Sequence, residues 1–299
     1  MLDISVIILT YNEELHIRRC IENVLTFAKE IFIIDSFSTD KTIEIAQAFK
    51  QVQILQNRWE NQYAKQFNWG LTHAPIKTKW VLRLDADEYL MPELITELHE
   101  KLPSLAPDIT GVIFKRRHIF MNKWMKRGTY PVKLLRLFQY GKGMCEQRFM
   151  DEHIQLTEGL DIEFNNDFID HNLNNISWFC NKHINYAIRE AIDLLAIELN
   201  LTSSYDLKMN LSEQAQKKRL QKFRYAQQPL FWRSSMYFCY RYFFKGACLE
   251  GKEGFIWTFL QGWWYRMLVD IKVYEIKKKC GSDKRKIIEY IRQHYNISI

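Results

Sequence analysis

Apolar and polar positions alternate in blocks along the N-terminal part of the chain, and the blocks predict strands and helices in turn. Short β-branched runs predict strands at residues 4–9, 31–34, 52–55 and 80–84. Between them, apolar residues recur at helical spacing over about 15–25, 43–49 and 62–73. Strands that alternate with helices form a mostly parallel sheet with helices on both faces. The pattern therefore predicts an α/β fold.

Polar clusters follow three of these strands, at residues 10–14, 35–40 and 85–88. Because ligands of parallel sheets bind beyond the carboxyl ends of the strands, we expect the three clusters to converge. Asp85 and Asp87, with one small residue between them, are hard oxygen donors suited to Mg²⁺ or Mn²⁺ carrying phosphate. Acidic residues also occur in ordinary surface turns, so this pair alone leaves both interpretations open.

Four motifs, in order, resemble glycosyltransferase family 2: residues 6–13 (VIILTYNE), 33–42 (IIDSFSTDKT), 63–71 (YAKQFNWGL) and 80–88 (WVLRLDADE). The resemblance implies a GT-A (Rossmann-like) fold and an inverting transfer from a nucleotide-sugar. Within the family the chain is most similar to the bacterial β-1,4-glucosyltransferase-like group that builds lipopolysaccharide core or capsule sugars. One departure is Phe37, where the family commonly has glycine; phenylalanine fits there only if the turn does not require a positive φ.

The resemblance also implies roles for residues at the strand ends. Thr10, Tyr11 and Glu13 would contact a uridine-type nucleoside, and Asp35 would hydrogen-bond its base. Asp87 would be the principal metal ligand, and Asp85 would bind ribose or assist the metal.

Lys65 would lie near the diphosphate, because its ammonium group suits anionic oxygens. Two plainer interpretations remain open: Tyr11 as an aromatic residue at the rim, and Lys65 as a solvated helix lysine. Arg83 is expected to face the other side of its strand and to pair with an acid.

An inverting transfer also requires a base that takes the proton of the attacking acceptor hydroxyl. The best candidate segment is Asp151-Glu152-His153. By resemblance we choose Glu152 as the base, with Asp151 as the alternative. His153 is a candidate metal ligand or orienting group, and His171 is a second candidate for the metal or diphosphate; a structural role remains open for both.

Composition is consistent with one enzymatic domain and an appendage. The chain has 299 residues and a formal net charge of +7. We expect a GT-A domain over 1–205 and a helical, aromatic and basic extension over 206–299. The six cysteines are scattered without a CxxC pair, which favours a reducing cytosol over a secreted disulfide scaffold or a zinc site.

The C-terminal extension is rich in Trp, Tyr and Phe beside Lys and Arg, especially over 231–244 and 255–274. Charged residues interrupt its apolar runs, so they fall short of a membrane-spanning helix. This composition favours peripheral contact with the inner membrane, because interfacial helices combine such residues and positive charge attracts anionic lipid. Packing against the catalytic domain or a second subunit is the alternative, and homo-oligomerisation stays open.

Other functions fit less well. Binding to nucleic acid is not expected, because the basic residues are spread and no recognition motif is present. A sugar nucleotidyltransferase also places carboxylates around Mg²⁺, but the first loop here has no glycine. An inactive nucleotide-sugar-binding module is the third alternative.

We therefore expect a transferase that uses Mg²⁺ or Mn²⁺. It would move a hexose from a UDP-sugar to a lipid-linked or polysaccharide acceptor of cell-surface glycan, at the cytoplasmic face of the inner membrane.

Overall fold

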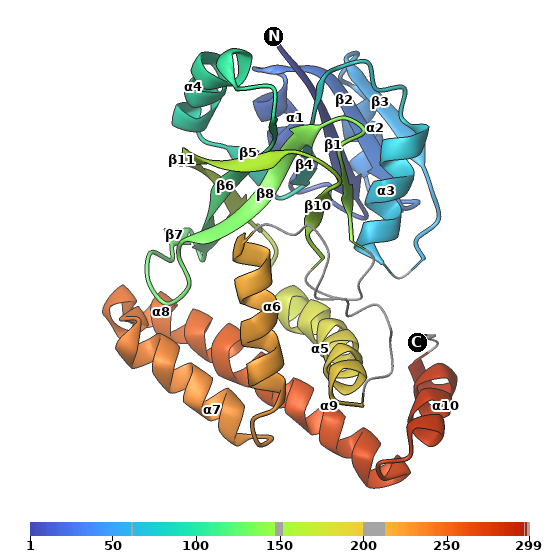
Figure 1. Ribbon diagram of the computed structural model, residues 1–299, viewed down its shortest axis with the longest axis vertical. Coiled ribbons are helices and arrows are strands. Elements are labelled where there is room, and N and C mark those ends of the chain that lie inside the picture. Colours follow the sequence, from blue (N-terminus) through green and yellow to red (C-terminus); the bar gives the residue numbers. More distant parts are fainter. Residues whose placement is uncertain (61, 147–151, 200–212, 296, 298–299) are drawn as a thin grey trace. The chain divides into compact units, whose positions relative to one another are not determined.

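The computed structural model describes residues 1–60, 62–146, 152–199, 213–295 and 297 (Figure 1). Within these residues the chain divides into two compact units. The first contains 1–124 and 130–173, and the second contains 125–129, 174–199 and the described residues from 213 onward. The helix at 176–199, which the expected boundary at 205 assigns to the first domain, belongs to the second unit.

The first unit is built on a mixed sheet that has nine strands among the described residues, in the order β3-β2-β1-β4-β8-β6-β11-β5, with β7 paired to β6. A separate hairpin joins β9 and β10. The strands are β1 (Leu2–Thr10), β2 (Ala28–Asp35), β3 (Val52–Gln56), β4 (Trp80–Asp85), β5 (Glu88–Leu90), β6 (Ile109–Phe120), β7 (Lys123–Trp124), β8 (Val132–Gln139), β9 (Gly143–Cys145), β10 (Ile154–Leu156) and β11 (Leu160–His171). The helices are α1 (Ile17–Val24), α2 (Thr42–Gln47), α3 (Tyr63–His73) and α4 (Pro92–Lys101), followed by the 3₁₀ turn η1 (Leu102–Ser104).

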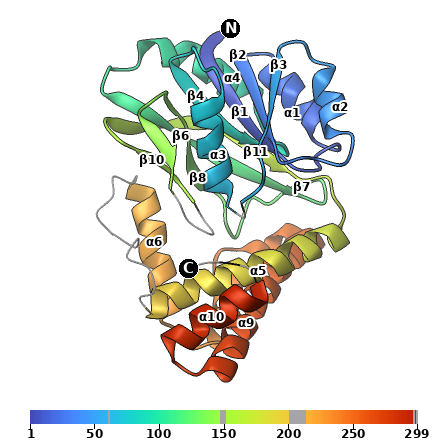
Figure 2. The same ribbon diagram turned by 90° about the vertical axis from the view of Figure 1, so that its right-hand side faces the viewer.

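The first four strands in the order are parallel, as the sequence predicts, and β8 then runs antiparallel to both β4 and β6. Figure 2 shows α3 in front of one face of this sheet. The arrangement is the expected GT-A fold: an α/β sheet with helices on both faces.

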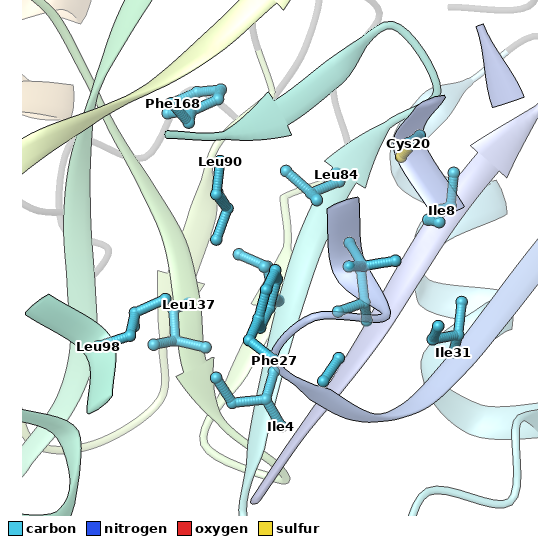
Figure 3. Close-up of a cluster of buried hydrophobic side chains, with 14 of the residues drawn as sticks. Ile4, Ile8, Cys20, Phe27, Ile31, Leu84, Leu90, Leu98, Leu137 and Phe168 are labelled. Atoms are coloured by element: carbon cyan, nitrogen blue, oxygen red, sulfur yellow. The ribbon is translucent and has the colours of Figure 1, made fainter. Parts of the chain in front are cut away.

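The two faces of β1 support two separate hydrophobic clusters, because successive strand residues point to opposite sides. Ile4 and Ile8 belong to the cluster that includes α1 and α4, and Figure 3 shows them among its side chains. Ile7 belongs to the cluster beneath α3 and the β9–β10 hairpin. Burial on both faces explains why β1 is almost continuously apolar.

The turn after β2 differs from the expectation for Phe37. Its backbone has φ 61°, in the left-handed region that favours glycine. The turn therefore does require a positive φ, and Phe37 adopts it with its side chain half exposed.

The second unit is helical. It contains α5 (Ile176–Leu199), α6 (Glu213–Ala226), α7 (Trp232–Cys239), η2 (Tyr240–Phe244), η3 (Ala247–Glu250), α8 (Gly251–Trp257), η4 (Thr258–Trp264), α9 (Tyr265–Cys280) and α10 (Lys284–Tyr295). A hydrophobic cluster joins α5, α9 and α10. The buried ion pair of Arg233 with Asp270, at 2.6 Å, ties α7 to α9. Among the described helices, none has the length and apolar character needed to cross a bilayer.

Candidate active site

The register of the parallel strands brings the predicted polar clusters together. Thr10 at the end of β1 is paired with Asp35 at the end of β2, and Leu9 is paired with Asp85 at the end of β4. The three strands are neighbours and end at the same edge of the sheet. The prediction that these clusters converge is confirmed.

Asp35 joins the first two loops. Its carboxylate is fully buried and accepts hydrogen bonds from the Thr10 hydroxyl at 2.9 Å and from the Ser38 backbone N–H at 2.9 Å and hydroxyl at 2.5 Å. Gln56 Nε2 adds a longer contact of 3.4 Å. In this structure Asp35 therefore fixes the shape of the loops, and hydrogen bonding to a base stays a prediction.

The other donor-side residues differ in how accessible they are. Tyr11 is 59% exposed directly after β1, where a planar base could stack on it. The carboxylate of Glu13 lies 2.6 Å from Nδ1 of His16, so Glu13 already has a partner within the protein. Lys65 on α3 donates to Glu60 at 2.9 Å. A diphosphate at Lys65 would have to compete with that partly exposed ion pair.

Cations and carboxylates alternate at the end of β4. Nη2 of Arg83 lies 4.0 Å from Asp85 and 3.7 Å from Glu152. Nη2 of Arg136, on β8, lies 3.8 Å from Asp85 and 2.6 Å from Glu88. The second oxygen of Glu88 accepts the Asp85 backbone N–H at 3.0 Å. Burial raises the pKa of the Glu88 carboxyl, and the adjacent Arg136 opposes that shift.

This alternation places Glu152 and Asp85 within 4.0 Å of one guanidinium nitrogen. The predicted pairing of Arg83 with an acid is confirmed, and one of its partners is the candidate base. The prediction that Arg83 faces the other side of its strand is wrong, because Arg83 and Asp85 are two residues apart on β4 and their side chains share the face that carries the candidate site. Arg83 also donates to the Cys145 sulfur at 3.3 Å, and burial raises the pKa of that thiol to about 12.

The β9–β10 hairpin carries Glu152 and is fastened to α3. Asn68 donates to the Cys145 carbonyl at 2.7 Å and accepts the Cys145 N–H at 2.8 Å. The backbone N–H of His153 donates to the Glu146 carboxylate at 3.0 Å, which extends the hairpin. Asp151, the alternative base, lies outside the described residues.

Asp87 lies next to the end of β11. Its carboxylate accepts a hydrogen bond from Asn172 Nδ2 at 2.9 Å, and its carbonyl accepts the His171 N–H at 3.0 Å. Arg19 from α1 donates to the carbonyls of both His171 and Asp87, at 2.7 and 3.3 Å. Burial and the nearby Arg19 lower the pKa of the His171 imidazole, which favours the neutral form that binds metals.

These donors fit a divalent cation that substrate oxygens complete. Asp85 and Asp87 are only partly buried, and Mg²⁺ is often held by one or two carboxylates plus substrate phosphates. Across the part of the chain that the structure describes, no group of three or more His, Cys, Asp or Glu side chains is arranged as a ready-made metal site.

Sequence reasoning missed Arg136, Glu88, Arg19 and Asn172. An arginine inside the apolar run of β8 is the one signal that pointed to Arg136, since buried charges are normally paired. Glu88 belongs to the predicted acidic cluster but was given no role. For Arg19 and Asn172 the local sequence carried no such signal, because their partners are far away in the chain.

The sheet, its loops and the acidic end of β4 define a GT-A glycosyltransferase. The profile of Glycosyl transferase family 2 matches residues 5–164, more than half of the chain. The chain therefore belongs to glycosyl transferase family 2, as its motifs indicated.

Several known proteins are similar over part of the chain. It is 29% identical over 147 residues to the lipopolysaccharide core biosynthesis glycosyltransferase LpsC of Rhizobium meliloti (strain 1021), which covers 48% of this chain and 53% of LpsC. It is 38% identical over 95 residues to an uncharacterized glycosyltransferase of Rickettsia bellii (strain RML369-C), covering 32% of this chain and 31% of that protein. The chain thus spans about half the length of the first relative and about a third of the second.

Among solved structures, the mannosyltransferase PcManGT of Pyrobaculum calidifontis, in complex with GDP-Man and Mn²⁺, is 14% identical with a TM-score of 0.48. The match covers 91% of this chain and 87% of that one.

Proposed function

We propose that this chain is a metal-dependent, inverting hexosyltransferase. It would move the sugar of a UDP-hexose to a lipid-linked or polysaccharide acceptor of bacterial cell-surface glycan. Membership of glycosyl transferase family 2 supports glycosyl transfer, and similarity to LpsC supports a lipopolysaccharide-type acceptor. The reaction would take place on the cytoplasmic side of the inner membrane.

The observation that carries this proposal is that the carboxylates of Asp85 and Glu152 both lie within 4.0 Å of the same nitrogen of Arg83. Asp85 lies at the end of β4, where the donor's ribose or the metal is expected to bind. Glu152 belongs to a different element, the β9–β10 hairpin. This arrangement suits an inverting transfer, which requires a base positioned beside the bound donor to take the proton of the attacking hydroxyl.

In the proposed reaction, Asp87 and Asp85 would hold Mg²⁺ or Mn²⁺, with His171 or His153 as a further candidate ligand. The bound cation would neutralise charge on the departing diphosphate. Thr10 and Tyr11 would border the nucleoside. Glu152 would accept the proton of the acceptor hydroxyl as that oxygen bonds to the anomeric carbon and the carbon–diphosphate bond breaks.

The test is turnover of a panel of UDP-hexoses and GDP-hexoses with Mn²⁺ and with EDTA, in the presence of a lipopolysaccharide-type acceptor. We expect UDP release that EDTA abolishes, and a β-linked product from an α-linked donor by NMR. An α-linked product would overturn the inverting mechanism. Turnover of GDP-sugars alone would overturn the UDP assignment, and a lack of turnover with all donors would overturn the transferase proposal.

A further inference from the structure

Large apolar side chains lie exposed along one side of α7 and η2 in the second unit. Trp232, Met236, Tyr240 and Phe244 follow one another at intervals of four residues, so they share one face of the helix. Phe243 and Leu249 are exposed nearby along the chain. We call these six residues the apolar face.

The apolar face is far more exposed than ordinary packing would leave it. Phe244 is 83% exposed, Leu249 72% and Trp232 71%. A shallow groove along the helix is lined by Trp232, Ser235, Met236, Cys239, Tyr240 and Phe244. Contiguous exposed apolar surface of this kind usually marks an interaction site.

Within the segment that carries the apolar face and α8, the charged residues that are exposed are both lysines. Within residues 231–258, Arg233, Arg241 and Glu250 are buried and Glu253 is half-buried, whereas Lys245 and Lys252 are exposed.

The loop at residues 125–129 adds two more exposed cations, Lys126 and Arg127. Its Gly128 N–H donates to the Lys245 carbonyl at 3.2 Å, so the loop lies against the end of η2. We call the four exposed cations of these two segments, Lys126, Arg127, Lys245 and Lys252, the basic rim.

We propose that the apolar face and its basic rim dock onto the surface of an anionic lipid bilayer. Aromatic rings flanked by lysine and arginine suit the membrane interface, where rings enter the headgroup region and cations meet lipid phosphates. A second copy of the chain fits less well, because pairing two such faces would oppose their cations, and lysine is depleted in protein interfaces. The proposal goes beyond the transfer reaction, since lipid binding requires neither donor nor turnover.

The test uses the full chain in flotation assays with vesicles of phosphatidylcholine and phosphatidylglycerol, and with phosphatidylcholine alone. We expect binding to the anionic vesicles that weakens as salt is raised. Phe243→Ser/Phe244→Ser should lower vesicle affinity about tenfold for each ring removed from the interface. Lys245→Gln/Lys252→Gln should lower it about fivefold for each lysine.

The matched control is Ile271→Ser/Tyr274→Ser on α9, because these side chains are 47% and 48% exposed but lie outside the apolar face. It should bind vesicles like the unmodified chain, and thermal unfolding by circular dichroism should show that all variants are folded.

The proposal is overturned if the unmodified chain does not bind anionic vesicles, or if the aromatic variant binds them with the same affinity as the unmodified chain. It is also overturned if gel filtration shows a dimer that the aromatic substitutions split, because the face would then be a self-interface. Metal-dependent UDP binding, measured separately on the same variants, should be unaffected; its absence from every variant would count against the transferase proposal alone.

Discussion

Individual side chains at the end of β4 form an alternating series of charges: Glu152, Arg83, Asp85, Arg136 and Glu88. Arg83, Arg136 and Glu88 are buried. Removing one partner of a buried ion pair leaves the other uncompensated, which typically costs about 3–5 kcal/mol. The series therefore fixes the positions of Asp85 and Glu152 before any substrate binds.

The role of Glu152 can be tested by Glu152→Gln, which keeps the size of the side chain but removes the basic carboxylate. We expect transfer to fall by about 10²–10⁴-fold, the usual contribution of general acid–base assistance. Donor affinity, measured by calorimetry, should stay close to that of the unmodified chain. Glu158→Gln is the control, because Glu158 is exposed and its carboxylate forms an ion pair with Lys142 at 3.2 Å. Full activity in Glu152→Gln would show that another residue is the base, and Asp151 would be the first candidate to test.

The positive φ of Phe37 gives a second test at this scale. A side chain with Cβ costs roughly 1 kcal/mol in the left-handed region, where glycine is unstrained. Phe37→Gly should therefore raise the free energy of unfolding by up to about 1 kcal/mol in urea denaturation. Phe37→Ala keeps the Cβ and should give no such gain. Equal stability of the Gly and Ala variants would show that the turn is not strained at this position.

Among the elements, the strands of the parallel half of the sheet were predictable because β1, β2 and β4 are short apolar runs that end in polar turns. The positions of the remaining strands in the sheet were harder to predict. The order β4-β8-β6-β11 depends on pairings between distant segments, and a one-dimensional pattern does not specify which strand enters between two others. Likewise, Glu152 was found from a local motif, whereas its contact with Arg83 depends on a hairpin that Asn68 fastens to α3.

The packing of α3 on the sheet offers a test at the scale of elements. A Cβ added at Gly70 would lie 2.7 Å from Cγ1 of Ile34 on β2, which is closer than side chains normally approach. Overpacking of this kind costs about 1–3 kcal/mol, whereas helix propensity favours Ala over Gly by about 1 kcal/mol. We expect Gly70→Ala to lower the free energy of unfolding by about 1 kcal/mol.

Thr72→Ala is the control for Gly70→Ala, since Thr72 is on the same helix and exposed. It should raise the free energy of unfolding by up to about 0.7 kcal/mol, because helix propensity favours Ala over Thr. A gain in stability for Gly70→Ala would mean that propensity dominates and that α3 does not approach β2 so closely.

For the whole molecule, the sequence predicts a catalytic fold followed by a helical, aromatic and basic extension. Periodicity alone does not identify which neighbour a helix packs against. The apolar pattern of α5 is equally compatible with the sheet, yet its buried residues, including Ala191 and Leu195, join those of α9 and α10. A sequence pattern could not predict the exposure of Trp232 and Phe244 either, because the burial of a ring depends on which other residues the fold packs over it.

The most direct test of the central claim is a calorimetric titration of the chain with UDP and with GDP, each in Mn²⁺ and in EDTA. We predict that UDP binds in Mn²⁺, that EDTA removes this binding, and that GDP binds more weakly. Asp87→Ala should behave in Mn²⁺ as the unmodified chain behaves in EDTA. UDP binding that is the same with and without metal would contradict the metal-dependent site, and no binding of either nucleotide would contradict the transferase account as a whole.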